Sequence, residues 1–199
     1  DKIVRTLSQI PPEDVQALEK AGQTVRDLIE STPIPEKIVK EIGQAYKKLC
    51  DLCNVPDLPV AIRSSATSED LKTASFAGQH ESYLWVRGEE QVIRHILKCW
   101  ASLFTDRAIA YRNQIGWPHD NVTISVGVQK MVKAKCAGVM FTIDPVLGDE
   151  DKIVVEGKWG LGESVVKGEV SPDHFLVDKK SHEILDKTIS PKTICYQLE

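Results

Sequence analysis

The sequence lacks the features of a membrane or secreted protein. No apolar run approaches the roughly 20 residues of a membrane-spanning helix, and the N-terminal segment DKIVRTLSQI lacks the charged-then-apolar pattern of a secretory signal. The 25 Lys and Arg residues are mixed with 29 Asp and Glu residues, which leaves a net charge of −4 and no basic stretch. Nucleic-acid-binding proteins need such a basic surface. We therefore expect a cytoplasmic globular protein that binds neither nucleic acid nor membrane.

Cysteine and histidine are too scattered to predict a metal site. The five cysteines are odd in number and irregularly spaced, which is typical of a reducing compartment. Cys50 and Cys53 form a single CxxC without a second pair or a histidine partner, so two incidental thiols at a helix end are favoured over a zinc or redox site. The five histidines share no constellation; they are His80, His95, His119, His174 and His182.

The sequence also has no initiator methionine and stops at Glu199 without an obvious end, so we expect a segment of a longer protein. Its 199 residues are enough for one domain or two small lobes with a sizeable core. Hydrophobic residues make up 42% and charged residues 27%, which is an ordinary globular composition.

Residues 1–57 are predicted to be helical. Pro11 and Pro12 precede a helical pattern of apolar residues, Pro33 and Pro35 interrupt it, and a second pattern runs over residues 38–49. Nothing in this region carries chemistry, so we interpret it as a helical lead-in that packs against a sheet.

A buried strand followed by a loop of small residues comes next. Residues 58–62 are apolar and predict the strand, which Arg63 ends, and the next fourteen residues are small or polar apart from Leu71 and Phe76. Backbone N–H groups, hydroxyls and one guanidinium suit the binding of phosphate. A flexible surface loop has the same composition. The residues alone leave both interpretations open.

The rest of the chain alternates helical and strand patterns. Strands are expected at 82–86 and 122–132, with two amphipathic helices between them. Residues 137–143 are expected to form a hairpin with the second of these strands across residues 133–136. Two further strands are expected at the end of the chain, at 152–157 and 173–178. This order predicts an α+β fold with two strand-rich parts.

Two segments, VAIRSSATSEDL from Val60 and ASFAGQ from Ala74, resemble the signature of the nucleotide-binding domain in the phosphoenolpyruvate synthase and pyruvate phosphate dikinase family. That family includes the rifampicin phosphotransferases. Further segments resemble family blocks in family order: ASLFTDRAIAYR, GVQKMV, GVMFTID, WGLGE and VSPDHF. The resemblance covers about residues 55 to 180. It implies an ATP-grasp-like fold with the helical lead-in at 1–57, a first lobe with the phosphate loop at 58–136, and a second strand-rich part at 137–199, truncated at its C-terminal end.

The resemblance also implies roles for individual residues. Arg63 matches the arginine that contacts the ATP phosphates and stabilises charge during transfer, and Gln129 matches the residue beside adenine. Gly78 and Ser82 match positions that line the nucleotide, although relatives often have Thr where this chain has Ser82.

Further candidates follow from the same match. The backbone around Met131 and Val132 is expected to read the adenine amino group. Ser64 and Thr67 are candidate phosphate-loop donors, and Arg107 is a candidate for a second phosphate contact.

Several of these residues have simpler alternatives. Gln129 can instead satisfy a neighbouring backbone group, and Arg107, beside Asp106, can be a solvated or ion-paired side chain. Asp144 and Glu163 could be metal ligands by residue type, but the ordinary role of acidic residues in turns is the favoured interpretation.

The function implied is that of an ATP-binding domain that donates phosphate to a histidine on a separate swivelling domain, for transfer to pyruvate. Alternatives are a related phosphotransferase with a rifampicin or phenol acceptor, or a non-catalytic remnant that acts as an interaction module. Three features of the resembled family are absent from these residues: the histidine motif of the swivelling domain, an early lysine in a glycine-rich segment, and a later acidic pair near the nucleotide and Mg²⁺. We therefore expect the ligands of Mg²⁺ mostly outside this fragment, which alone is expected to be inactive.

Overall fold

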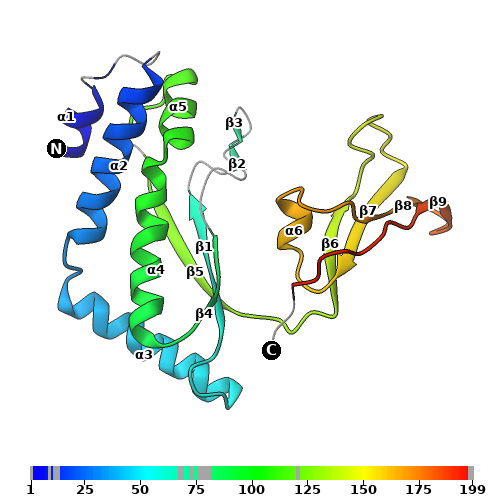
Figure 1. Ribbon diagram of the computed structural model, residues 1–199, viewed down its shortest axis with the longest axis horizontal. Coiled ribbons are helices and arrows are strands. Elements are labelled where there is room, and N and C mark those ends of the chain that lie inside the picture. Colours follow the sequence, from blue (N-terminus) through cyan, green and yellow to red (C-terminus); the bar gives the residue numbers. More distant parts are fainter. Residues whose placement is uncertain are drawn as a thin grey trace. The chain divides into compact units, whose positions relative to one another are not determined.

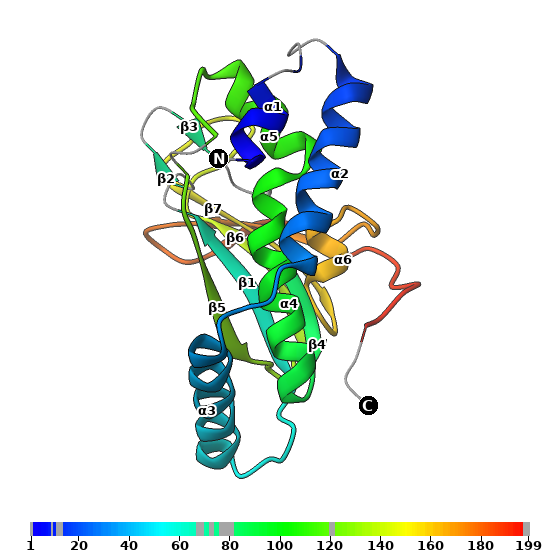
Figure 2. The same cartoon turned by 90° about the vertical axis from the view of Figure 1, so that its left-hand side faces the viewer.

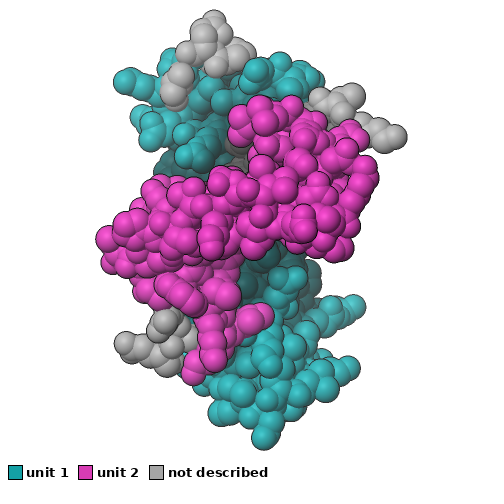
Figure 3. Space-filling model, turned by 90° about the vertical axis from the view of Figure 1, so that its right-hand side faces the viewer, with its two compact units in different colours: residues 1–131 teal, residues 132–199 magenta. Residues whose placement is uncertain are grey.

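The structure is a computed structural model that describes residues 2–8, 10, 14–66, 70–71, 74–75, 82–119 and 122–196. The chain divides into two compact units, residues 1–131 and 132–199, which Figure 3 shows in different colours. Both units contain antiparallel sheets and at least one helix, which confirms the predicted α+β class. No helix in the described ranges is long and apolar enough to cross a membrane.

Unit 1 begins with helices, as predicted. Asp14 caps the second of them, because its Oδ1 accepts a hydrogen bond of 3.0 Å from the Ala17 N–H. Asn54 ends the third in the left-handed conformation, with φ of 52°. The first helix lies within the region predicted to be helical, although no separate pattern was identified for it. The bounds are α1 Lys2–Ser8, α2 Val15–Ser31 and α3 Glu36–Cys53.

A three-stranded antiparallel sheet follows, with β1 (Val60–Ala66) between β4 (Ser82–Val86) and β5 (Ile124–Lys130). The prediction that Arg63 ends the first strand was wrong. β1 continues to Ala66 because its ladder to β5 is made of backbone groups, which small polar residues supply as well as apolar ones. The short strands β2 (Asp70–Leu71) and β3 (Ala74–Ser75) pair within the segment predicted as a loop.

Helices cover one face of this sheet. α4 (Glu89–Ala101) lies against all three strands, and α2 packs on α4, as Figures 1 and 2 show. Val60 and Ile62 are fully buried beneath Tyr46, Val92 and neighbouring residues of α3 and α4. The 3₁₀ turn η1 (Ser102–Phe104) and α5 (Asp106–Gln114) form a second core with α1 and α2. The other face of the sheet carries none of these helices.

Unit 2 is a four-stranded antiparallel sheet in the order β6-β7-β8-β9, with the short helix α6. The predicted hairpin between residues 122–132 and 137–143 was wrong, since β5 pairs with β1 and β6 pairs with β7. Residues 133–136 contain no Gly, Asn or Asp for a tight hairpin turn. The bounds are β6 Cys136–Phe141, β7 Lys152–Trp159, α6 Glu163–Val166, β8 Asp173–Asp178 and β9 Ile184–Thr188.

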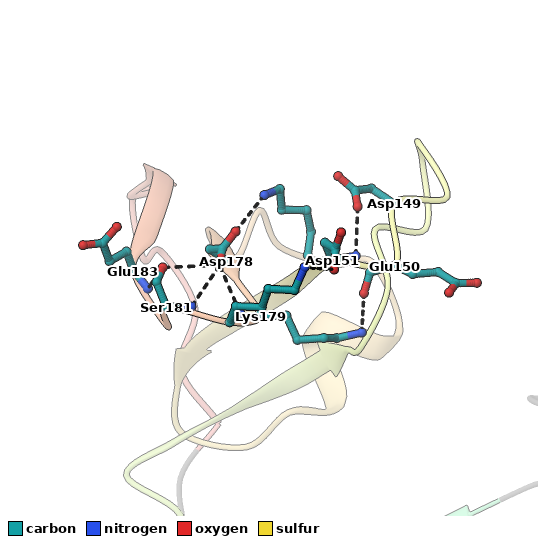
Figure 4. A network of polar contacts seen from close by, with 9 residues as sticks. Asp149, Glu150, Asp151, Asp178, Lys179, Ser181 and Glu183 are labelled. Carbon is teal, nitrogen blue, oxygen red and sulfur yellow. Dashed lines mark hydrogen bonds and ion pairs between the residues drawn. The ribbon is translucent and has the colours of Figure 1, made fainter.

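A polar network closes the turn after β8 (Figure 4). Asp178 Oδ1 accepts hydrogen bonds from the backbone N–H groups of Lys180 and Ser181, at 3.0 and 2.9 Å, and Oδ2 lies 3.0 Å from Lys152 Nζ. The Ser181 N–H, the Lys152 ammonium and the Lys180 N–H together hold the pKa of the Asp178 carboxyl well below its ordinary value. The network therefore stabilises the turn when Asp178 is ionised.

Protonation of the Asp178 carboxylate should make the stability of the protein depend on pH. Because the folded-state pKa of Asp178 is depressed, its contribution to stability is present above the ordinary value of 3.8 and is lost as pH falls through the folded-state pKa. Urea unfolding should show Asp178→Asn less stable than wild type at pH 7, with the gap narrowing steadily below pH 4. Asp186→Asn, at an exposed carboxylate on β9, is the control. A gap that stays constant down to pH 2 would contradict this role.

Arg112 on α5 is a buried charge to which the sequence assigned no role. The residue is 0% exposed, its Nη2 donates to Leu103 O at 2.6 Å, and its Nε donates to His119 Nδ1 at 3.0 Å. The guanidinium lies 5.6 Å from the centre of the Phe104 ring. Burial lowers its pKa to about 10. Arg112 thus ties α5 to η1 and to the turn that follows α5.

We predict that Arg112→Ala lowers the free energy of unfolding by about 2 to 4 kcal/mol, because it empties a buried site and removes the donors for two acceptors. Arg107→Ala on the same helix removes an exposed arginine and should change stability by no more than about 0.5 kcal/mol. Urea denaturation of both variants measures the difference. Equal effects would show that Arg112 does not support the fold in this way.

Candidate functional site

Arg63 lies on the face of the unit 1 sheet that the helices leave open. Side chains alternate along a strand, so the burial of Ile62 against the helices directs Arg63 to the opposite face. Arg63 is exposed, and its side chain makes no hydrogen bond or ion pair with another residue in the described ranges. A guanidinium held on a central strand with its donors free is suited to bind an anion.

Two other predicted residues share this face. Ser82 on β4 lies directly opposite Arg63, and Gln129 on β5 lies opposite Ala61, two residues along β1 from Arg63. Directly opposed side chains in an antiparallel pair are about 5 Å apart at Cβ. The structure thus brings together side chains from all three strands of the sheet. The Gln129 side chain is exposed and bonds no backbone group in the described part of the chain, so the simpler alternative for it has no support.

A β-bulge places Ser82 beside Arg63. Val60 pairs with Val86, but the register then shifts by one residue, so that Arg63 faces Ser82. Without the shift, the bulky Tyr83 would face Arg63; instead it packs against the helix-covered core. Trp85 lies at the bulge in the left-handed conformation, with φ of 62°. The bulge, with its strained backbone at Trp85, therefore places the small Ser82 side chain, rather than a tyrosine, beside the Arg63 guanidinium.

Within the part of the chain that the structure describes, the Met131 carbonyl at the end of β5 accepts no backbone hydrogen bond. The Met131 N–H donates to Pro59 O at 3.0 Å, and an ordinary antiparallel pair would return a second bond to the Met131 C=O. Proline has no N–H, so that bond cannot form. Val132 O accepts from the Ala134 N–H at 2.9 Å, and Val132 is 72% exposed. Of the two residues predicted to read an amino group, Met131 thus offers the carbonyl without a ladder partner.

Other predicted residues are not brought to this face. Ser64 lies on the helix-covered side of β1, opposite Val126, and Arg107 lies on α5 in the helical layer. Thr67 and Gly78 lie outside the described residues. Sequence reasoning missed Ser65, which shares the face of Arg63 and whose carbonyl accepts a 3.0 Å hydrogen bond from Ser125 Oγ. Strand alternation from Arg63 would have found it.

The described residues hold no metal site. No group of three or more His, Cys, Asp or Glu side chains is close enough to ligate an ion within these ranges. Asp144 forms the predicted turn, since its Oδ1 accepts from the N–H groups of Val146 and Leu147 at 2.8 and 3.1 Å. Glu163 pairs with Lys167 one helical turn on, at 2.6 Å.

The open face offers two kinds of binding group. Arg63 and Ser82 can bind an anion, whereas the Gln129 amide and the Met131 carbonyl can bind a polar ring further along β5. A ligand with a phosphate chain at one end and a hydrogen-bonding base at the other matches this arrangement.

Comparison with known proteins identifies a family for the chain. A family model described as "Pyruvate phosphate dikinase, AMP/ATP-binding domain" matches residues 1–199. A probable phosphoenolpyruvate synthase of Methanocaldococcus jannaschii is 49% identical over 192 residues, which is 96% of this chain and 16% of that protein.

Two further relatives carry the same name. The phosphoenolpyruvate synthase of Aeropyrum pernix is 51% identical over 174 residues, which is 87% of this chain and 21% of the relative. That of Pyrococcus furiosus is 44% identical over 194 residues, which is 98% of this chain and 24% of the relative. The chain thus spans less than a third of the length of these proteins.

The bulge at Trp85 gives a stability prediction. Trp85→Asn and Trp85→Ala both remove the indole, but Asn adopts the left-handed conformation more readily than Ala. Trp85→Asn should therefore have a free energy of unfolding about 0.5 to 1 kcal/mol higher than that of Trp85→Ala, as measured by urea denaturation. If the Ala variant is as stable or more stable, the left-handed backbone at this position is not strained.

Proposed function

Since the chain belongs to the pyruvate phosphate dikinase AMP/ATP-binding domain family, and is thus an ATP-binding domain, we propose that it binds ATP on the open face of the β4-β1-β5 sheet. We further propose that it is the phosphate-donor part of a phosphotransferase of the phosphoenolpyruvate synthase type. The proposal rests on one observation: Arg63, Ser82 and Gln129 lie on the same exposed face of the sheet.

The phosphate end of ATP binds Arg63 in this proposal. A guanidinium presents a planar fork of donors that matches two phosphate oxygens at once, and the Ser82 hydroxyl is its neighbour across the strands. Phosphoryl transfer depends on positioning and on neutralising the charge of the transferred group. Arg63 supplies both because its strand is held by pairs on either side. Thr67 and Gly78 remain candidates from the family resemblance, whereas Ser64 and Arg107 lie away from this face.

The base end binds further along β5. The Gln129 amide faces the adenine, and the Met131 carbonyl accepts a hydrogen bond from the adenine amino group. Support for this role comes from the missing N–H of Pro59, which leaves that carbonyl without its ladder bond. Val132, next in the chain, has an exposed apolar side chain and is a further candidate for contact with the base.

Mg²⁺, which ATP-dependent phosphoryl transfer ordinarily uses, does not fit the described residues of this face. Mg²⁺ is usually held by one or two carboxylates together with phosphate oxygens. The residues that share the face of Arg63 are Ala61, Ser65, Ser82, Ser125, Gly127 and Gln129, none of which is acidic. The roles proposed for Arg63 and Gln129 do not depend on the ion.

The acceptor and the other partners follow from the longer relatives. We propose that ATP phosphorylates a histidine on a separate swivelling domain, in the cytoplasm, and that pyruvate receives the phosphate afterwards. The histidine nitrogen forms the new bond to phosphorus, and the leaving nucleotide keeps the electron pair of the broken P–O bond. The relatives are named phosphoenolpyruvate synthases, which supports pyruvate over rifampicin or a phenol as the acceptor.

Isothermal titration of Mg-ATP into the full-length protein tests the phosphate contact. Arg63→Ala should weaken ATP binding by roughly ten- to a hundredfold, because hydrogen bonds to a charged group contribute about 1.5 to 3 kcal/mol. Arg94→Ala is the matched control, since Arg94 is an exposed arginine on α4, the helix that covers the opposite face of the sheet.

The control should bind ATP within about twofold of wild type, because a distant exposed charge is screened by salt. If Arg63→Ala and Arg94→Ala bind ATP equally well, the triphosphate does not contact Arg63 and the proposed site is wrong.

A further inference from the structure

The residue opposite Arg63 on β5 is a glycine. Gly127 pairs directly with Arg63, in the middle of a strand of seven residues. Glycine in the interior of a strand destabilises it, because the chain loses more freedom on folding and no side chain packs. Such a position needs a reason.

The fold itself gives no reason for a glycine there. Gly127 is not among the glycines with positive φ, and the nearest atom that an added Cβ would meet among the described residues is the Arg63 carbonyl oxygen, at 3.9 Å. That distance is an ordinary van der Waals contact. Gly138 in unit 2 is different, because a Cβ there would lie 1.9 Å from the backbone carbonyl oxygen of Glu156. The described residues thus leave the space above Gly127 open.

The other neighbours of Arg63 on this face are also small. Ser82 lies across β4, and Ala61 and Ser65 lie on either side along β1. A side chain at position 127 would stand beside the guanidinium, about 5 Å away at Cβ. It would therefore occupy the space through which an anion reaches Arg63 from the side of β5.

We propose that Gly127 is a positioning residue that leaves room for the phosphate chain of ATP to cross β5 and reach Arg63. This inference rests on the proposed function. Gln129 lies two residues away on the same face, and Met131 two residues beyond it, so the nucleotide runs along β5 with its phosphates over Gly127 and its base toward Met131. The four steps along the strand from residue 127 to residue 131 span about 13 Å, a length that an extended nucleoside triphosphate can cover.

The test compares two ligands on variants of the full-length protein. ATP has both the base and the phosphates, whereas inorganic tripolyphosphate has the phosphates alone. Gly127→Val should weaken binding of both ligands at least tenfold, and Gly127→Ala at least threefold, by isothermal titration. Gln129→Ala should weaken binding of ATP but leave tripolyphosphate unchanged.

Stability separates this role from a structural one. Valine favours strands, so the urea midpoint of Gly127→Val should equal or exceed that of wild type while its affinity falls. If Gly127→Val does not fold, Gly127→Ala decides by the same threefold criterion.

The result also distinguishes two failures. If the folded Gly127 variants bind both ligands as wild type does while Arg63→Ala loses ATP, the role of Gly127 is wrong and the proposed site stands. If Arg63→Ala also binds ATP normally, the proposed function itself is wrong.

Discussion

The alternation of side chains along β1 is the constraint on which the open face depends. Val60 and Ile62 are buried against α3 and α4, and their burial fixes which way every other residue of the strand points. A shift of one residue in register would bury Arg63 and expose Ile62, at a large cost in desolvated charge and lost apolar burial. The helical layer thus holds the guanidinium on the opposite face by packing alone.

Three backbone features adapt the strands around that guanidinium. The bulge at Trp85 places Ser82, rather than an aromatic residue, opposite Arg63. Gly127 has no side chain on the neighbouring strand β5. Pro59 has no N–H to donate to the Met131 carbonyl. Each lowers the regularity of the sheet. All three lie along one face, where they leave space or an unpaired acceptor for a ligand.

Patterns local in sequence were predictable, and pairings distant in sequence were not. The periodicity of α4 and the alternation of β5 predicted their positions, because burial of one face repeats along each element. The end of β1 was missed because Ser64 to Ala66 are held by backbone bonds to β5, some 60 residues away. The family resemblance identified Arg63, Ser82 and Gln129, but the register across three strands was needed to bring them to one face and to separate Ser64 from it.

The most direct measurement of the central claim is a crystal structure of the protein with ATP. The account predicts a phosphate oxygen about 2.8 Å from the Arg63 guanidinium nitrogens, with adenine beside Gln129. ATP bound elsewhere, with Arg63 and Gln129 both free of the nucleotide, would contradict it.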